Sequence, residues 1–145
     1  MRLTKGITGL DAQHLLQQDL RSFQSMVYHL VTSEPRAKAL EFVDDPNNVY
    51  MSATIQLEDE QLIILHHRLT PYIAFATGED NLAFVFTTKT YLHKYFPMRK
   101  CLEADVLNTS LEKDKQFHNL SDREWEFVSH FRSEKIGDVM FNCWD

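Results

Sequence analysis

Two adjacent histidines, His66 and His67, end the apolar run QLIILHH and are the first candidates for chemistry. Imidazole serves proteins as a general base and as a metal ligand. If the run is a strand, successive side chains point to opposite faces, so the two rings cannot share one metal ion or one reacting bond. We therefore expect both histidines to be structural residues at the rim of a strand. A metal-independent hydrolase or ribonuclease-type enzyme that uses one of them, with Lys94, is kept as an alternative hypothesis.

Motifs that mark the common catalytic and cofactor sites are absent from the chain. With four glycines, at positions 6, 9, 78 and 137, it contains neither the dinucleotide and phosphate loops nor the hydrolase elbow that require closely spaced glycines. None of the seven histidines forms a pair with a recognised metal-binding spacing. We predict no catalytic residue, no metal site and no cofactor.

Composition describes one globular domain that spans residues 1–145. Hydrophobic residues make up 43% of the chain and charged residues 25%, which is enough apolar material for a packed core at this length. No run approaches the 18 or so apolar residues of a membrane helix, and the polar N-terminus resembles neither a signal nor a transit peptide. The two cysteines, Cys101 and Cys143, are far apart and are expected to be free thiols. These features predict a cytoplasmic protein.

The net charge of −6 argues against a nucleic-acid-binding protein and favours a basic protein as partner. The charge is unevenly distributed. No Lys or Arg occurs between Ala39 and His67, whereas the segment 81–102 carries four basic residues and no acidic one. Basic and aromatic residues alternate around Lys94, a pattern also found in single-strand nucleic-acid surfaces, but four cations in an acidic chain are weak evidence for one.

A long N-terminal helix is predicted from apolar residues that recur at steps of three and four: Leu16, Leu20, Phe23, Val27 and Leu30. Thr8 is a candidate N-cap for a helix that begins at Gly9 or Leu10, and Pro35 marks its latest end.

The period then changes from 3.6 to 2, which is typical of half-buried strands. Five strands are expected, at residues 37–43, 49–57, 62–67, 72–77 and 82–87. The links between them are too short for parallel crossovers, so they predict an antiparallel meander.

The last third of the chain predicts helices and a final strand. TKTYLHKYFP predicts a short helix that stops at Pro97, and Ser121 with Glu124 forms a capping box for a helix that begins at Asp122. Trp125, Val128 and Phe131 are expected to point inward, and IGDVMFNCWD alternates like a strand. The predicted fold class is therefore α+β, with an antiparallel meander of about five to six strands, a long N-terminal helix packed on it, C-terminal helices and a final strand.

Two turns of this meander carry the candidate binding residues. Successive turns of a meander fall at alternate ends of the sheet, so the second and the fourth turn emerge at the same end, about 10 Å apart. Five carboxylates would then share one rim that attracts basic surfaces: Glu58, Asp59, Glu60, Glu79 and Asp80.

We therefore expect a small, acidic, non-enzymatic protein-binding module, such as an inhibitor or immunity-type partner that neutralises a basic toxin or nuclease. A second alternative, besides the enzyme, is a structural subunit of a homo-oligomer.

Overall fold

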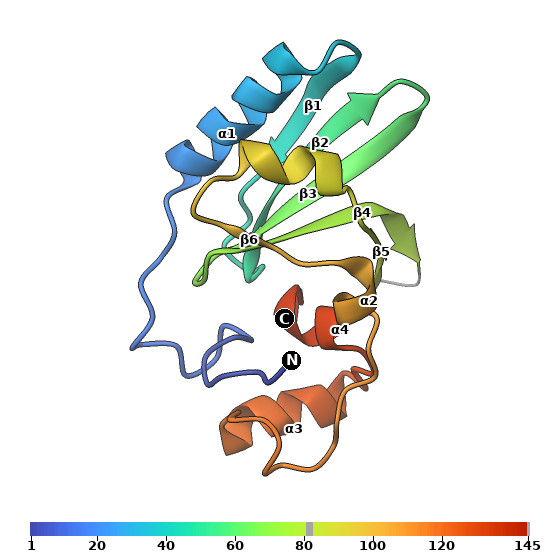
Figure 1. Ribbon diagram of the computed structural model, residues 1–145. Coiled ribbons are helices and arrows are strands. Elements are labelled where there is room, and N and C mark those ends of the chain that lie inside the picture. The colour runs from blue at the N-terminus through green and yellow to red at the C-terminus, as the bar shows by residue number, and fades with distance from the viewer. Residues whose placement is uncertain (81–82, 145) are drawn as a thin grey trace.

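The computed structural model of the chain describes residues 1–80 and 83–144, and only the backbone of Leu40, Glu79, Asp80 and Ala83. Its core is a sheet whose five sequential strands pair antiparallel in the order β1-β2-β3-β4-β5 (Figure 1). Their bounds are β1 Ala37–Val43, β2 Tyr50–Leu57, β3 Glu60–His67, β4 Tyr72–Asp80 and β5 Ala83–Thr87. The short strand β6, Lys100–Cys101, pairs parallel with β4. The predicted α+β fold with an antiparallel meander is confirmed.

One face of the sheet is covered by α1, Leu20–Ser33, and by the 3₁₀ helix η1, Thr90–Tyr95. The apolar face of α1 buries Phe23, Val27 and Leu30 completely. These side chains pack with the residues of β2 and β3 that point to the same side, among them Ile55 and Ile64. The predicted helix at TKTYLHKY is thus present, although it is a 3₁₀ and not an α-helix.

The other face is covered by the N-terminal segment and by the last part of the chain. This part contains α2 Ala104–Leu107, α3 Asp122–His130 and α4 Ile136–Met140, with α3 farthest from the sheet (Figure 1). Leu3, Ile7, Trp125 and Val139 share this second core with Leu65 of β3. Because both faces of the sheet are covered, β3 is buried on both sides along most of its length.

Helix α1 begins at Leu20, well after the predicted start at Gly9 or Leu10. Asp19 is its N-cap, and its side chain accepts a hydrogen bond from the amide of Arg21. Thr8 does not cap this helix, because its hydroxyl donates to the carboxylate of Glu124 in α3. Leu16, which the periodicity places on the buried face, is 84% exposed. Residues 10–19 run instead along the surface as an irregular segment.

The predicted final strand is wrong. Residues 136–140 form the short helix α4, and residues 141–144 have no regular structure. Gly137 lies inside α4 against the ring of Phe86. The capping box of Ser121 and Glu124 is confirmed, and Trp125 and Val128 point inward. Phe131 does not, because it is 39% exposed and stacks on Trp144.

Candidate functional site

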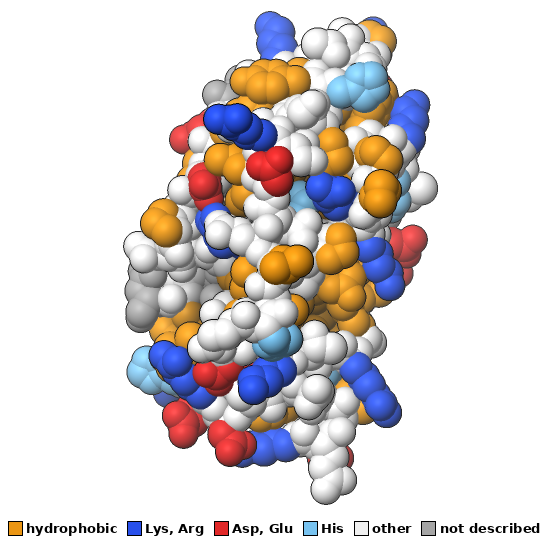
Figure 2. Space-filling model, turned by 90° about the vertical axis from the view of Figure 1, so that its left-hand side faces the viewer, with side chains coloured by type: hydrophobic (Ala, Val, Ile, Leu, Met, Phe, Trp, Pro, Cys, Tyr) orange, Lys and Arg blue, Asp and Glu red, His pale blue; other side chains and the backbone are white. Residues whose placement is uncertain are grey.

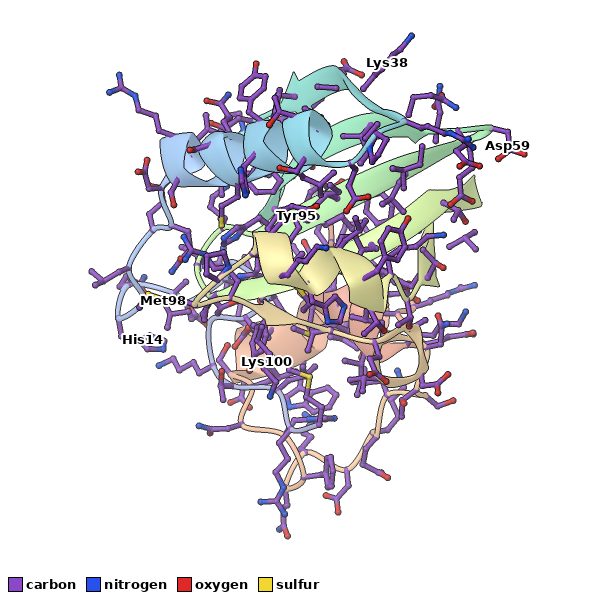
Figure 3. All side chains as sticks on the ribbon, turned by 45° about the horizontal axis from the view of Figure 1, so that its top comes forward. His14, Lys38, Asp59, Tyr95, Met98 and Lys100 are labelled. Atoms are coloured by element: carbon purple, nitrogen blue, oxygen red, sulfur yellow. The ribbon has the colours of Figure 1, made fainter. Side chains whose placement is uncertain are left out.

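The turn between β2 and β3 contains Glu58 and Asp59, and Glu60 begins β3. The turn between β4 and β5 follows Asp80. Because the strands pair as a meander, the β2–β3 turn and the paired ends of β4 and β5, Asp80 and Ala83, lie at the same end of the sheet. Asp59 is exposed and projects from the tip of its hairpin (Figure 3).

Two of the five predicted carboxylates are paired with cations of the same chain. Arg36 lies 2.7 Å from Glu58, and Lys89 lies 2.6 Å from Glu60. Among the side chains of this group that the structure describes, Asp59 is the one that forms no ion pair. The side chains of Glu79 and Asp80 lie outside the described part of the chain. The negative field of the β2–β3 turn is therefore weaker than three free carboxylates would produce.

The two acidic turns share one end of the sheet, but the ladder that joins their hairpins stops short of them. Paired residues of β3 and β4 extend only from His66↔Ile73 to Ile63↔Ala76. Beyond Ala76 the register of β4 with β5 also shifts. The expected spacing of about 10 Å assumes a continuous ladder, so the two turns are better treated as separate surfaces.

A pocket of about 480 Å³ lies beside the β2–β3 turn. The end of α1, the start of β1, the end of β2 and η1 form its walls, lined by Glu34, Pro35, Arg36, Ala37, Leu57, Glu58 and Tyr91. Glu58 therefore belongs both to the acidic turn and to the pocket. The sequence gives no signal for this pocket, because its walls come from four elements that only the packing of α1 and η1 brings together.

Glu34 is the most tightly held charge in the pocket. Its Oε1 atom accepts a hydrogen bond of 2.5 Å from the hydroxyl of Tyr95 and lies 4.0 Å from Nζ of Lys94. The hydrogen bond to the carboxylate raises the pKa of Tyr95, because it stabilises the protonated phenol. Figure 3 shows Tyr95 on η1, close to the end of α1. These contacts fix one carboxylate at the pocket wall, whereas Glu58 and Arg36 remain exposed.

His66 and His67 lie on opposite faces of β3, as predicted, but they are completely buried rather than at a rim. In His66, Nδ1–H donates to the carbonyl of His67 and Nε2 accepts from Nε–H of Arg99. In His67, Nε2–H donates to the carbonyl of Ile7 and Nδ1 accepts from the amide of Leu69. All four ring nitrogens are thus occupied by internal partners.

Burial lowers the pKa of both histidines to about 4, because the charged form would lose its hydration. Each ring is therefore neutral at neutral pH. Neither has the exposure that a catalyst needs to reach a substrate. Their role is to connect the sheet to Arg99 on one face and to the N-terminal segment on the other.

Three of the four basic residues in the segment 81–102 lie beside acidic or polar groups of the same chain, although Lys94 and Lys100 remain exposed. Lys89 pairs with Glu60, Lys94 lies near Glu34, and Arg99 donates to His66 and to the hydroxyl of Ser22. On the face drawn in Figure 2, hydrophobic, basic and acidic side chains are interspersed, with no continuous region of one charge. This arrangement gives no support to a nucleic-acid surface.

Glu124, predicted only as the partner of Ser121 in a helix capping box, has a second structural role. Glu124 is 0% exposed and accepts four hydrogen bonds. The donors are the amides of Gly6, Thr8 and Ser121 and the hydroxyl of Thr8. The capping box identifies Glu124, but only the fold reveals that it also binds the N-terminal segment.

A second pocket, of about 330 Å³, lies where the β1–β2 and β3–β4 turns meet the N- and C-terminal segments. Arg68 lines it, but pairs with Asp44 and donates to the carbonyls of Asp45 and Asn48. Asn142, also in its wall, donates to the carbonyls of Thr8 and Val139. The side chains of Arg68 and Asn142 are therefore occupied by the fold itself.

No group of three or more His, Cys, Asp or Glu side chains within residues 1–80 and 83–144 could hold a metal ion. None of the helices in these ranges is long and apolar enough to cross a membrane. Comparisons with protein-family models, curated proteins and solved structures find no match to this chain.

Proposed function

We propose that this chain is a small, acidic, non-enzymatic module that binds a basic protein, as an inhibitor or an immunity-type partner neutralises a toxin or nuclease. The observation that supports this proposal most is the position of Glu58, which belongs both to the exposed β2–β3 turn and to the 480 Å³ pocket. The turn offers charge for the first encounter, and the pocket offers a concave surface for a partner side chain.

The exposed ion pair in this pocket is easily exchanged. The side chains of Arg36 and Glu58 are 72% and 60% exposed, and such pairs contribute only about 0–1 kcal/mol. A guanidinium group of a partner could therefore replace Arg36 on Glu58 at little cost. Tyr91, which is 53% exposed, presents an aromatic ring in the same pocket, and such rings attract cations.

The enzyme hypothesis loses the two residues on which it was based. His66 and His67 are buried, neutral and fully hydrogen-bonded, so a hydrolase or ribonuclease-type site would have to use other groups. Of the residues named for that alternative only Lys94 remains, and it is exposed beside Glu34, whereas the binding hypothesis gains a pocket beside one of its predicted residues.

Affinity capture with two baits tests the proposal. The first bait is the wild-type chain, and the second carries Glu58→Gln, Asp59→Asn and Glu60→Gln, which remove charge but keep size. A basic protein that binds the first bait and is lost from the second would support the proposal. Capture of the same proteins by both baits, or recovery only of RNA or a small metabolite, would contradict it.

A further inference from the structure

Strand β1 forms one edge of the sheet. It pairs with β2 on one side and, within the described residues, with no strand on the other. In Figure 3 it runs along the upper border of the molecule, and Lys38 points away from the body. An edge of this kind presents backbone N–H and C=O groups that can pair with a further strand.

A β-bulge places two opposite charges on the same face of this edge. The register runs Lys38↔Gln56, Ala39↔Ile55 and then Glu41↔Thr54, so Leu40 is the extra residue. Gln56 and Thr54 are two residues apart on β2 and point to the same face. Lys38 and Glu41 therefore also share that face. Without the bulge, two residues three positions apart would point to opposite faces.

Hydrogen-bonded and non-hydrogen-bonded pairs alternate along an antiparallel ladder. Because the partners of Lys38 and Glu41 on β2 are two residues apart, the bulge places Lys38 and Glu41 in pairs of the same type. Both side chains are exposed, and their cross-strand neighbours on β2, Gln56 and Thr54, are uncharged. The edge thus carries a cation and an anion that are available to a partner strand.

We propose that β1 pairs antiparallel with β1 of a second copy of this chain, about a two-fold axis between Ala39 and Leu40. This register places Lys38 of each copy opposite Glu41 of the other, so the interface contains two complementary charge pairs. In antiparallel pairing, residues opposite each other point to the same face. Lys38 and Glu41 share a face only because of the bulge, so the bulge makes this register possible for two identical strands. The inference does not depend on the proposed function.

The face that carries α1 is also compatible with this pairing. On this side Ala37, the cross-strand neighbour of Leu57, would lie opposite Phe42 of the second copy. Phe42 contacts Tyr28 of α1, with ring centroids 5.3 Å apart, and Tyr28 is 54% exposed. Pairing of the strands would bring a second chain against these rings and remove part of their surface from water.

Bulges and charged side chains also serve to protect edge strands from pairing. The two roles predict different results. If the edge is protected, the chain stays monomeric whatever the sign of the charges at positions 38 and 41. If the edge is self-complementary, reversal of one charge prevents dimerisation, and mixing of the two opposite reversals restores it.

The experiment uses the full chain and two single variants, Lys38→Glu and Glu41→Lys, measured by light scattering and sedimentation at concentrations up to about 1 mM, which detects weak association. Wild type should dimerise. Each variant alone should be monomeric, because its homodimer would place like charges opposite each other twice. An equimolar mixture of the two variants should dimerise again, because every opposed pair then has one charge of each sign.

Lys115→Glu, an exposed charge reversal far from β1 in the sequence, is the control and should leave dimerisation unchanged. Amide NMR spectra of each variant show whether it is folded. A wild-type chain that stays monomeric at the highest concentration would overturn the proposal. So would folded single variants that dimerise alone, or that fail to associate when they are mixed.

Discussion

The imidazoles of His66 and His67 are neighbours in sequence, yet one contacts Phe23 of α1 on one face of the sheet and the other contacts Phe141 on the opposite face. Both remain neutral because burial lowers the pKa of each from 6.5 to about 4. Because of these lowered pKa values, the free energy of unfolding depends on pH.

We expect stability to fall as the pH is lowered from 6.5 to 4. In this window the unfolded chain binds protons at these two residues and the folded chain does not, so protonation favours unfolding. Above pH 6.5 both histidines are neutral in the folded and in the unfolded chain, so the free energy of unfolding has its full value. Acidification to pH 4 lowers the free energy of unfolding by about 3 kcal/mol for each histidine. Urea denaturation at a series of pH values measures it. The variant with His66→Gln and His67→Gln should be less stable at pH 7 but lose much less stability on acidification, whereas exposed His130→Gln should behave like wild type.

Glu124→Gln should destabilise the protein by about 2–4 kcal/mol. The amide nitrogen cannot accept hydrogen bonds, so at least one buried donor of the N-terminal segment or of the helix cap would lose its partner. Denaturant unfolding gives the free energy, and hydrogen exchange at the amides of Gly6 and Thr8 reports the local loss. Glu126→Gln, on the exposed side of α3, is the matched control and should change neither.

Gly137→Ala should cost about 1–3 kcal/mol through overpacking. A Cβ atom at this position would collide with the ring of Phe86 and lie 3.0 Å from the carbonyl oxygen of Leu107. Gly78→Ala, where a Cβ meets nothing within 4 Å, is the control. Equal stability of the two variants in thermal unfolding would show that α4 does not pack on β5 as described.

Met98→Gly should stabilise the protein by about 0.5–1 kcal/mol. Met98 has a φ angle of 61°, in the left-handed region that side chains with a Cβ rarely adopt, and it is 94% exposed. Met98→Ala removes the same exposed atoms but keeps the Cβ, so it should give no gain. If both variants unfold at the same denaturant concentration, strain at this residue is not significant.

The proposed binding surface predicts an effect on association kinetics. Replacement of the carboxylates of both acidic surfaces, Glu58, Asp59 and Glu60 on one and Glu79 and Asp80 on the other, by their amides should lower the association rate constant for the basic partner, most strongly at low salt, and leave the fold stable. The control replaces Glu112, Asp114, Asp122, Glu126 and Glu134, which lie in the C-terminal part of the chain, and therefore makes the same change in net charge. Surface plasmon resonance with the captured partner compares the two. Equal rates at low ionic strength would contradict the proposal.

Local patterns were sufficient to predict much of this fold. Five apolar and polar alternations separated by short turns define the meander, and the spacing of Phe23, Val27 and Leu30 defines the buried face of α1. The capping box at Ser121 involves residues three positions apart, so it too could be predicted.

The errors occur where distant residues decide the local structure. In the sequence, Thr8 is a candidate helix N-cap. In the structure the Thr8 hydroxyl donates instead to the carboxylate of Glu124, 116 residues away. Residues 139–143 show the alternation of a strand. Residues 136–140 nevertheless form the helix α4, in which Gly137 lies against Phe86. The pocket at Glu58 has no sequence signal either, since α1, β1, β2 and η1 each contribute part of it.

The contacts of Glu124 also set an order of events during synthesis. Gly6 and Thr8 leave the ribosome more than a hundred residues before the carboxylate that binds their amides. At about 5–20 residues per second, the N-terminal segment waits several seconds or longer for its partner. The meander can pair during that time, but one of its faces stays uncovered until α3 and α4 emerge. A nascent chain arrested before α3 should therefore expose that face to chaperones, and the emergence of α3 and α4 covers it.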